Sequence, residues 1–152
     1  MKASAVILIL LITTMLPGCA THPGLGKAPS TGTQFRLAAL SKIKNDVSLI
    51  MEMPSANNAI SNQVMVASIK AGVDAIAVVD LVAIFKGPNT KPIAVIGDND
   101  AITAATIEAA LKRLQGFQPS AKFYFVGEAS YGQSLKAHAD AVGVSFEAVV
   151  YP

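Results

Sequence analysis

The stretch "PIAVIGDNDAITAATIEAALKRLQG", residues 92 to 116, decides the fold of this chain. It opens with a short apolar run, residues 92–97, which predicts a buried β-strand. From residue 99 to 116 the apolar positions change to the three-and-four spacing of a helix. The positions expected to face inward are Ile107, Ala110, Leu111 and Leu114.

The same alternation continues to the end of the chain. "KFYFVG" (122–127) predicts a second strand, which is apolar on both faces and therefore central. Residues 130–143 predict a helix, and "SFEAVVY" (145–151) alternates as an edge strand with one wetter face would. The order strand-helix-strand-helix-strand predicts the α/β class: a small, mainly parallel sheet of three clear strands with helices packed on its faces.

Two helices are predicted ahead of this unit. Residues 33–53 carry apolar side chains at helical spacing, and Pro54 limits how far that helix continues. Residues 55–72 predict a second helix with Gly72 as its C-terminal cap. The positions of this second helix expected to share one side are Ile60, Val64, Ala67 and Ala71.

Residues 73–85, "VDAIAVVDLVAIF", have an ambiguous pattern. Their β-branched side chains favour a buried strand, joined by an antiparallel hairpin to the strand at 92–97 as a fourth member of the sheet. Helical spacing is also present and leaves a helix open as the alternative. We expect the strand.

The N-terminus has the layout of an exported signal peptide. Lys2 precedes an uncharged apolar run, residues 3–15, that is shorter than the roughly 20 residues a membrane-spanning helix needs. The following "LPGC" (16–19) resembles the lipobox of bacterial lipoproteins, with leucine three positions before the cysteine and a small residue directly before it. The resemblance implies that residues 1–18 are a lipoprotein signal peptide and that Cys19 carries the lipid. An ordinary secretory leader cut after Ala20 is the alternative.

The lipoprotein resemblance also implies a location. In enterobacterial lipoproteins, an aspartate directly after the lipidated cysteine resembles an inner-membrane retention signal. This chain has Ala20 at that position, so we expect attachment through Cys19 to the periplasmic face of the outer membrane. Residues 19–33, rich in Pro, Gly, Ser and Thr, are then the lipidated cysteine and a flexible tether. Residues 34–152 form a single α/β domain.

Composition excludes several functions. A chain with 52% hydrophobic and 14% charged residues suits one compact domain. The net charge of +2, without a basic cluster, argues against nucleic-acid binding. Cys19 is the only cysteine, so a lipidated chain has no thiol left for catalysis, disulfides or thiolate metal sites. We expect no cofactor and no metal site.

Polar side chains follow two of the predicted strands. Asp98, Asn99 and Asp100 come directly after the strand at 92–97, and Glu128 and Ser130 follow the strand at 122–127. Ligands of parallel sheets bind outside the carboxyl ends of the strands, so these five residues are the candidate ligand-binding site. The alternative is that they cap the helices that follow.

Two functions remain open. The first is a lipid-anchored periplasmic module that binds or scaffolds another envelope component, since no complete catalytic constellation is present. The second is a small-ligand or cation-binding domain, or a small hydrolase, with its site at the carboxyl ends of the strands. Ser130 lies in a near match to the Gly-x-Ser-x-Gly nucleophile turn, but Glu128 stands where its first glycine should be.

Overall fold

The computed structural model describes residues 30–43, 47–88, 91–120 and 122–151. Its elements in chain order are α1 (Thr31–Ile43), β1 (Leu49–Met53), α2 (Ala59–Lys70), α3 (Ile76–Lys86), β2 (Ile93–Gly97), α4 (Asp100–Lys112), β3 (Phe123–Gly127), α5 (Ala129–Ala141) and β4 (Phe146–Val150). The strands form one sheet in the order β1-β2-β3-β4, and every neighbouring pair is parallel. The predicted α/β class is therefore confirmed.

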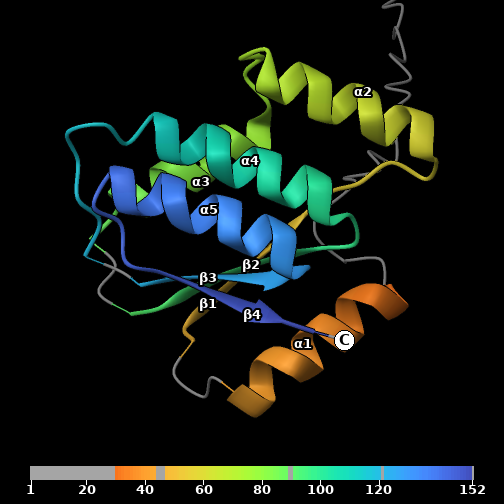
Figure 1. Cartoon of the computed structure of the whole chain (residues 1–152), viewed down its shortest axis with the longest axis horizontal. Helices are drawn as coiled ribbons and strands as arrows, with labels where there is room; N and C mark the ends of the chain where they lie inside the picture. The colour runs from red at the N-terminus through yellow and green to blue at the C-terminus, as the bar shows by residue number, and fades with distance from the viewer. Residues whose placement is uncertain (1–29, 44–46, 89–90, 121, 152) are drawn as a thin grey trace, which may run out of the picture.

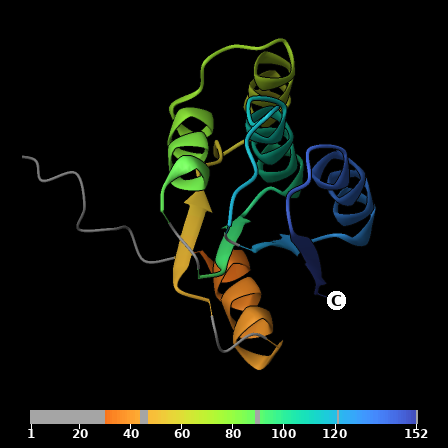
Figure 2. The same ribbon diagram turned by 90° about the vertical axis from the view of Figure 1, so that its left-hand side faces the viewer.

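The helices cover the sheet unequally. Figures 1 and 2 show α1 alone on one face, while α3, α4 and α5 lie over the opposite face. The remaining helix, α2, packs on α4 and lies farther from the sheet than the other three (Figure 1). The domain therefore has a thin side formed by α1 and a thick side that ends in α2.

Because successive side chains of a strand point to opposite faces, the sheet supplies two cores. The larger core lies under α3, α4 and α5 and includes Phe123, which packs edge-on against Phe85 of α3 with ring centroids 4.7 Å apart. The smaller core lies under α1. Its buried members are Leu40, Ala94, Ile96, Tyr124, Val126 and Val149.

The prediction for residues 92–151 is confirmed in its main features. β2, α4, β3, α5 and β4 occupy the expected segments, and β3 is central with all five residues buried. The four positions predicted to face inward, three in α4 and Leu114 in the turn after it, are at most 1% exposed. On its outer side, Lys112 donates a 2.7 Å hydrogen bond to Glu108, one helical turn away.

The helix predicted for residues 33–53 is confirmed as far as Ile43 and wrong beyond it, and the strand predicted for residues 73–85 was wrong. The first helix begins at Thr31, inside the segment expected to be tether, and ends at Ile43; Leu49–Met53 then form β1 rather than a continued helix. Residues 76–86 form α3, so the expected antiparallel hairpin is absent and the fourth strand is β1, paired parallel to β2. The β-branched residues of α3 are tolerated in a helix because Val78, Leu81 and Phe85 are buried in the larger core.

α2 confirms the second predicted helix and its C-terminal cap at Gly72. The turn after it is a Schellman motif, in which the amides of Gly72 and Val73 donate to the carbonyls of Ile69 and Ser68. Gly72 takes the left-handed conformation, φ +89°, that this motif requires. Two of the residues expected on one apolar side, Ile60 and Val64, are 76% and 60% exposed.

Among the described residues, none of the helices is long and apolar enough to cross a membrane.

Candidate functional site

The three polar residues after β2 lie at the carboxyl edge of the sheet, as predicted, but each has a different partner. Asn99 caps α4: its side-chain oxygen accepts a 3.0 Å hydrogen bond from the Ile102 amide. The capping alternative is therefore correct for Asn99. Asp98 and Asp100 instead reach across the sheet edge to α1.

Asp98 lies at the N-terminus of α1. Its Oδ1 accepts hydrogen bonds from the Thr33 amide at 3.0 Å and from the Thr33 hydroxyl at 2.8 Å, and the Ser30 hydroxyl donates to the same oxygen. The Ser30 hydrogen bond is the main reason that the pKa of Asp98 lies below its ordinary value, with burial acting in the opposite direction. A carboxylate at this position also neutralises the positive end of the helix dipole.

Asp100 forms a buried ion pair with Arg36 of α1. The Nη2 atom of Arg36 lies 2.7 Å from Oδ1 of Asp100, and the two side chains are 6% and 5% exposed. The second carboxylate oxygen, Oδ2, accepts a 2.8 Å hydrogen bond from the Glu128 amide at the start of α5. Asp100 therefore connects α1 and α5, which lie on opposite faces of the sheet.

Tyr151, directly after β4, completes this cluster. Arg36 Nη2 donates to its hydroxyl oxygen at 2.5 Å, and the guanidinium carbon lies 4.6 Å from the centre of its ring. Burial and the negative charge of Asp100 raise the pKa of the Tyr151 hydroxyl. Glu52 joins at the opposite end of the edge, where its carboxylate lies 3.0 Å from the Thr33 hydroxyl oxygen and competes with Asp98 for the single hydroxyl proton.

We call Thr33, Arg36, Asp98, Asp100 and Tyr151 the edge cluster. It brings together side chains from α1 and from the ends of β2 and β4. Most of its hydrogen-bonding capacity is used within the protein, and the Nε atom of Arg36 is buried without a partner. Such an arrangement holds α1 in place; it offers little capacity to a dissolved cation.

Glu128 and Ser130 do not converge on the edge cluster with their side chains. Glu128 contributes its backbone amide, and its side chain is exposed. Ser130 lies in the first turn of α5 and is also exposed. His138 of α5 lies 3.5 Å from Glu108 of α4, so it belongs to a different surface from Ser130. Within the part of the chain that the structure describes, no group of three or more His, Cys, Asp or Glu side chains is placed to hold a metal ion.

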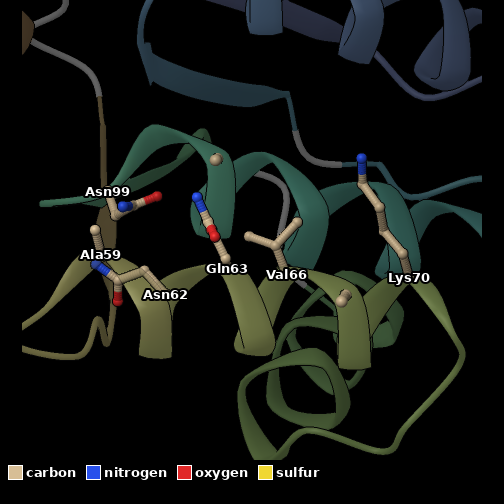
Figure 3. Close-up of a pocket in the computed structure, with 8 residues that line it drawn as sticks. Ala59, Asn62, Gln63, Val66, Lys70 and Asn99 are labelled. Atoms are coloured by element: carbon tan, nitrogen blue, oxygen red, sulfur yellow. The ribbon is translucent and has the colours of Figure 1, made fainter.

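Two cavities lie beside residues of the candidate site, one at Arg36 and Tyr151 and one at Asn99. One, of about 570 Å³, lies beside α1 and the end of β4, with Phe35, Arg36, Lys42 and Tyr151 in its wall. The other, of about 450 Å³, lies between α2 and α4. Figure 3 shows Gln63, Val66 and Lys70 of α2 pointing toward α4 across this second cavity, with Asn99 at its end.

The orientation of α2 follows from the residues that it packs inward. Met65, Val66 and Ile69 contact the larger core, so the opposite side of the helix, with Ile60 and Val64, is turned outward. Two side-chain contacts define the start of α2: Asn62 accepts a 2.7 Å hydrogen bond from the Ala56 amide, and Asn58 caps the helix by accepting from the Ser61 amide at 2.8 Å. Ile69 is the one residue of α2 that is fully buried.

The outward side of α2 forms a continuous apolar stripe. Its members are Ile60, Val64 and Ala67 of the helix and Ala71 at its C-cap, all exposed. No charged residue occurs between Pro54 and Ile69, so the helix itself is uncharged up to Lys70. We call these four residues the α2 stripe. Exposed apolar surface with few charges is typical of the centre of a protein–protein interface.

Sequence analysis placed the four members of the α2 stripe on one side of a helix, and the structure shows that this side is exposed. Arg36 and Tyr151 were missed as partners of Asp100, because they lie 64 and 51 residues away in the chain. Cys19, the predicted lipidation site, lies outside the described residues.

No family model, no curated protein and no solved structure matches this chain.

Proposed function

We propose that this protein is a lipid-anchored lipoprotein of the cell envelope, located at the periplasmic face of the outer membrane, that works by binding another protein through the α2 stripe. The anchor rests on the resemblance of residues 16–19 to a lipobox. The binding role rests on one structural observation, the outward rotation of α2.

That orientation costs the isolated domain stability, because apolar side chains stay in contact with water. Ile60 and Val64 remain 76% and 60% exposed, and fully burying a side chain of this kind is worth about 1.5–3 kcal/mol. The inward packing of Met65, Val66 and Ile69 holds the helix in this orientation despite the cost. A helix held with its apolar stripe in solvent is explained when a second surface covers the stripe.

The partner expected at this surface is a protein helix. The stripe repeats at intervals of four, three and four residues, which is the spacing of the contact seam between two packed helices. A membrane surface fits less well, because helices that lie in the bilayer interface carry Lys and Arg on the polar side and large apolar residues on the other. α2 has one lysine, and half of its stripe is alanine.

The edge cluster supports this function indirectly. Its carboxylates are engaged by α1 and by the Glu128 amide, which argues against the cation site considered from the sequence. We therefore place the principal contact at α2. The cavity of about 570 Å³ beside α1 and the end of β4 has a size that suits a small ligand, and Phe35 and Val150 in its wall are 66% and 52% exposed. This cavity is the place for the second function considered, small-ligand binding.

The anchor is tested by the mass of the N-terminal peptide of the mature protein. We expect a peptide that starts at Cys19 and carries acyl chains, and a Cys19→Ala variant that no longer sediments with membranes. A mature chain with an unmodified Cys19 thiol would contradict the anchor.

The contact is tested by photo-crosslinking in intact cells. A photoreactive amino acid at position 64, in the α2 stripe, is expected to give a discrete protein adduct. The matched control is the same amino acid at position 35, because Phe35 is also 66% exposed but lies on α1, on the opposite side of the sheet. Absence of an adduct at position 64, or the same adduct at both positions, would contradict the proposed contact.

A further inference from the structure

The α2 stripe has a gradient of side-chain size along its length. At the N-terminal end it presents Ile60 and Val64, which are large, and at the C-terminal end it presents Ala67 and Ala71, which are small. These positions lie on one side over about three helical turns, because positions that alternate by four and three residues share a side. Against a flat surface, the large side chains of such a stripe would touch while the small ones left gaps.

A second copy of the same helix, running in the opposite direction, would match this gradient. Antiparallel pairing about a two-fold axis places Ile60 against Ala71 of the second copy and Val64 against Ala67 of the second copy. Every layer then combines one large and one small side chain, which is how packed layers fill space without voids. A parallel pair would instead place isoleucine on isoleucine at one end and alanine on alanine at the other.

The residues that flank the stripe are compatible with the antiparallel arrangement. Ser61 and Ser68 lie on one side of the stripe, and Gln63 and Lys70 on the other. In the antiparallel pair Lys70 lies beside Gln63 of the second copy, so the two lysines do not face each other. The interface would contain no like-charge pair at its flanks, which is a condition for helix pairing.

We infer that the partner of the α2 stripe is a second copy of this chain, bound through an antiparallel, two-fold symmetric α2–α2 contact. This inference rests on the proposed function, since it names the partner of the same surface. The self-complementary stripe is what a two-fold interface requires, because each copy contributes the same residues.

The α2–α2 contact is small, so we expect it to be weaker in dilute solution than between two copies anchored to one membrane. A helix of 12 residues is about 18 Å long, too short to bury the roughly 1,600 Å² of a standard stable interface. Association in dilute solution is therefore weak. Anchoring both copies to one membrane raises their effective concentration and favours the dimer without any additional contact.

The first test measures self-association of the full chain carrying Cys19→Ser by sedimentation over a range of concentrations. Val64→Glu is expected to weaken association about 100-fold or more, because symmetry applies the loss of burial and the added charge twice. The matched control Phe35→Glu removes an equally exposed apolar side chain from α1 and is expected to leave association unchanged. Equal effects of the two variants, or no self-association of the parent at any concentration, would overturn the inference. Circular dichroism identifies a variant that fails to fold, and Val64→Ala then replaces it with a smaller expected effect in the same direction.

The second test determines the direction of the pair. Single variants Ile60→Cys and Ala71→Cys are prepared in the same Cys19→Ser background, so that each chain holds one thiol. The antiparallel pair predicts a disulfide in the mixture of the two variants and little in either alone. Equivalent positions in that pair lie about 16 Å apart along the axis, beyond the 7 Å limit for a disulfide. A disulfide between two copies of Ile60→Cys would show parallel pairing and would overturn the inference.

Photo-crosslinking at position 64 separates failure of the inference from failure of the proposed function. An adduct with twice the mass of the chain supports both. An adduct with a different protein overturns self-pairing and leaves the proposed function intact, and an adduct with lipid overturns the protein partner altogether. No adduct of any kind overturns both proposals.

Discussion

The guanidinium of Arg36 lies at the carboxyl edge of the sheet, with Asp100 at 2.7 Å and the Tyr151 hydroxyl at 2.5 Å. An ion pair this deeply buried is costly to desolvate, and it stabilises a fold mainly when all of its members are present. Removing one member leaves an uncompensated charge in the interior. The pair therefore makes the position of α1 specific.

This gives a prediction for stability. Arg36→Met should lower the free energy of unfolding by about 3–5 kcal/mol, because Asp100 would stay buried with the Glu128 amide as its remaining close donor. Lys42→Met on the same helix is the matched control: its side chain is exposed, and the expected change is within about 0.5 kcal/mol. Urea denaturation measures both. Equal midpoints for the two variants would show that the buried pair is dispensable.

The hydrogen bond from Ser30 to Asp98 gives a second prediction, on pH dependence. Because the pKa of Asp98 is lowered in the folded state, its contribution to stability is complete above its ordinary value, near 3.8, and is lost as the pH falls through the folded pKa. Ser30→Ala should raise the pKa of Asp98 toward 3.8, since this hydrogen bond is the largest cause of the shift. An NMR titration of the Asp98 carboxyl group measures the change; an unaltered pKa would refute the assignment.

Residue-level prediction from the sequence succeeded where the signal was local. Asn99 is followed by its own helix, so its capping role follows from chain order alone. Asp98 and Asp100 were placed at the correct edge of the sheet, but their partner helix α1 lies on the far face, and only the folded structure brings Arg36 to them. The need for glycine at position 127 is likewise visible only in the folded structure, because a Cβ there would lie 3.0 Å from the Asp100 side chain.

At the level of elements, sequence analysis made two errors: it predicted a helix where β1 lies and a strand where α3 lies. β1 is a five-residue edge strand with Leu49 and Ile50 partly exposed, so its sequence lacks the continuous burial pattern that reveals β2 and β3. α3 is rich in β-branched residues yet helical, because three of its side chains complete the core over the sheet. In both segments long-range packing overrode local propensity.

The loose attachment of α2 predicts its dynamics. α2 buries one residue, Ile69, and packs mainly on α4, whereas α4 buries nine residues in the centre of the thick layer. In dilute solution, backbone amides of α2 should exchange with deuterium well before those of α4, because α2 can open without disturbing the core. Mass-spectrometric hydrogen exchange compares the two helices. Equal protection would mean that α2 belongs to the cooperative core.

At the level of the whole molecule, the two notable surfaces lie on opposite sides of the sheet. The described chain enters the domain at Ser30, where the edge cluster fixes α1, and the α2 stripe lies beyond α4 on the other side (Figure 1). One side of the domain is thus secured by buried polar contacts, and the other presents a neutral apolar helix. This division suits a module that is tethered through its N-terminal side and binds through α2.

The most direct test of this account is the accessibility of α2 in the envelope. A Val64→Cys variant that is lipidated at Cys19 should react slowly with maleimide in native membranes, because a protein covers the stripe. The same substitution in a dilute, unanchored Cys19→Ala chain should react fast. Phe35→Cys, on the opposite side of the sheet, should react at similar rates in both settings. Fast labelling of Val64→Cys in native membranes would contradict the account, because it would leave the α2 stripe uncovered where the protein works.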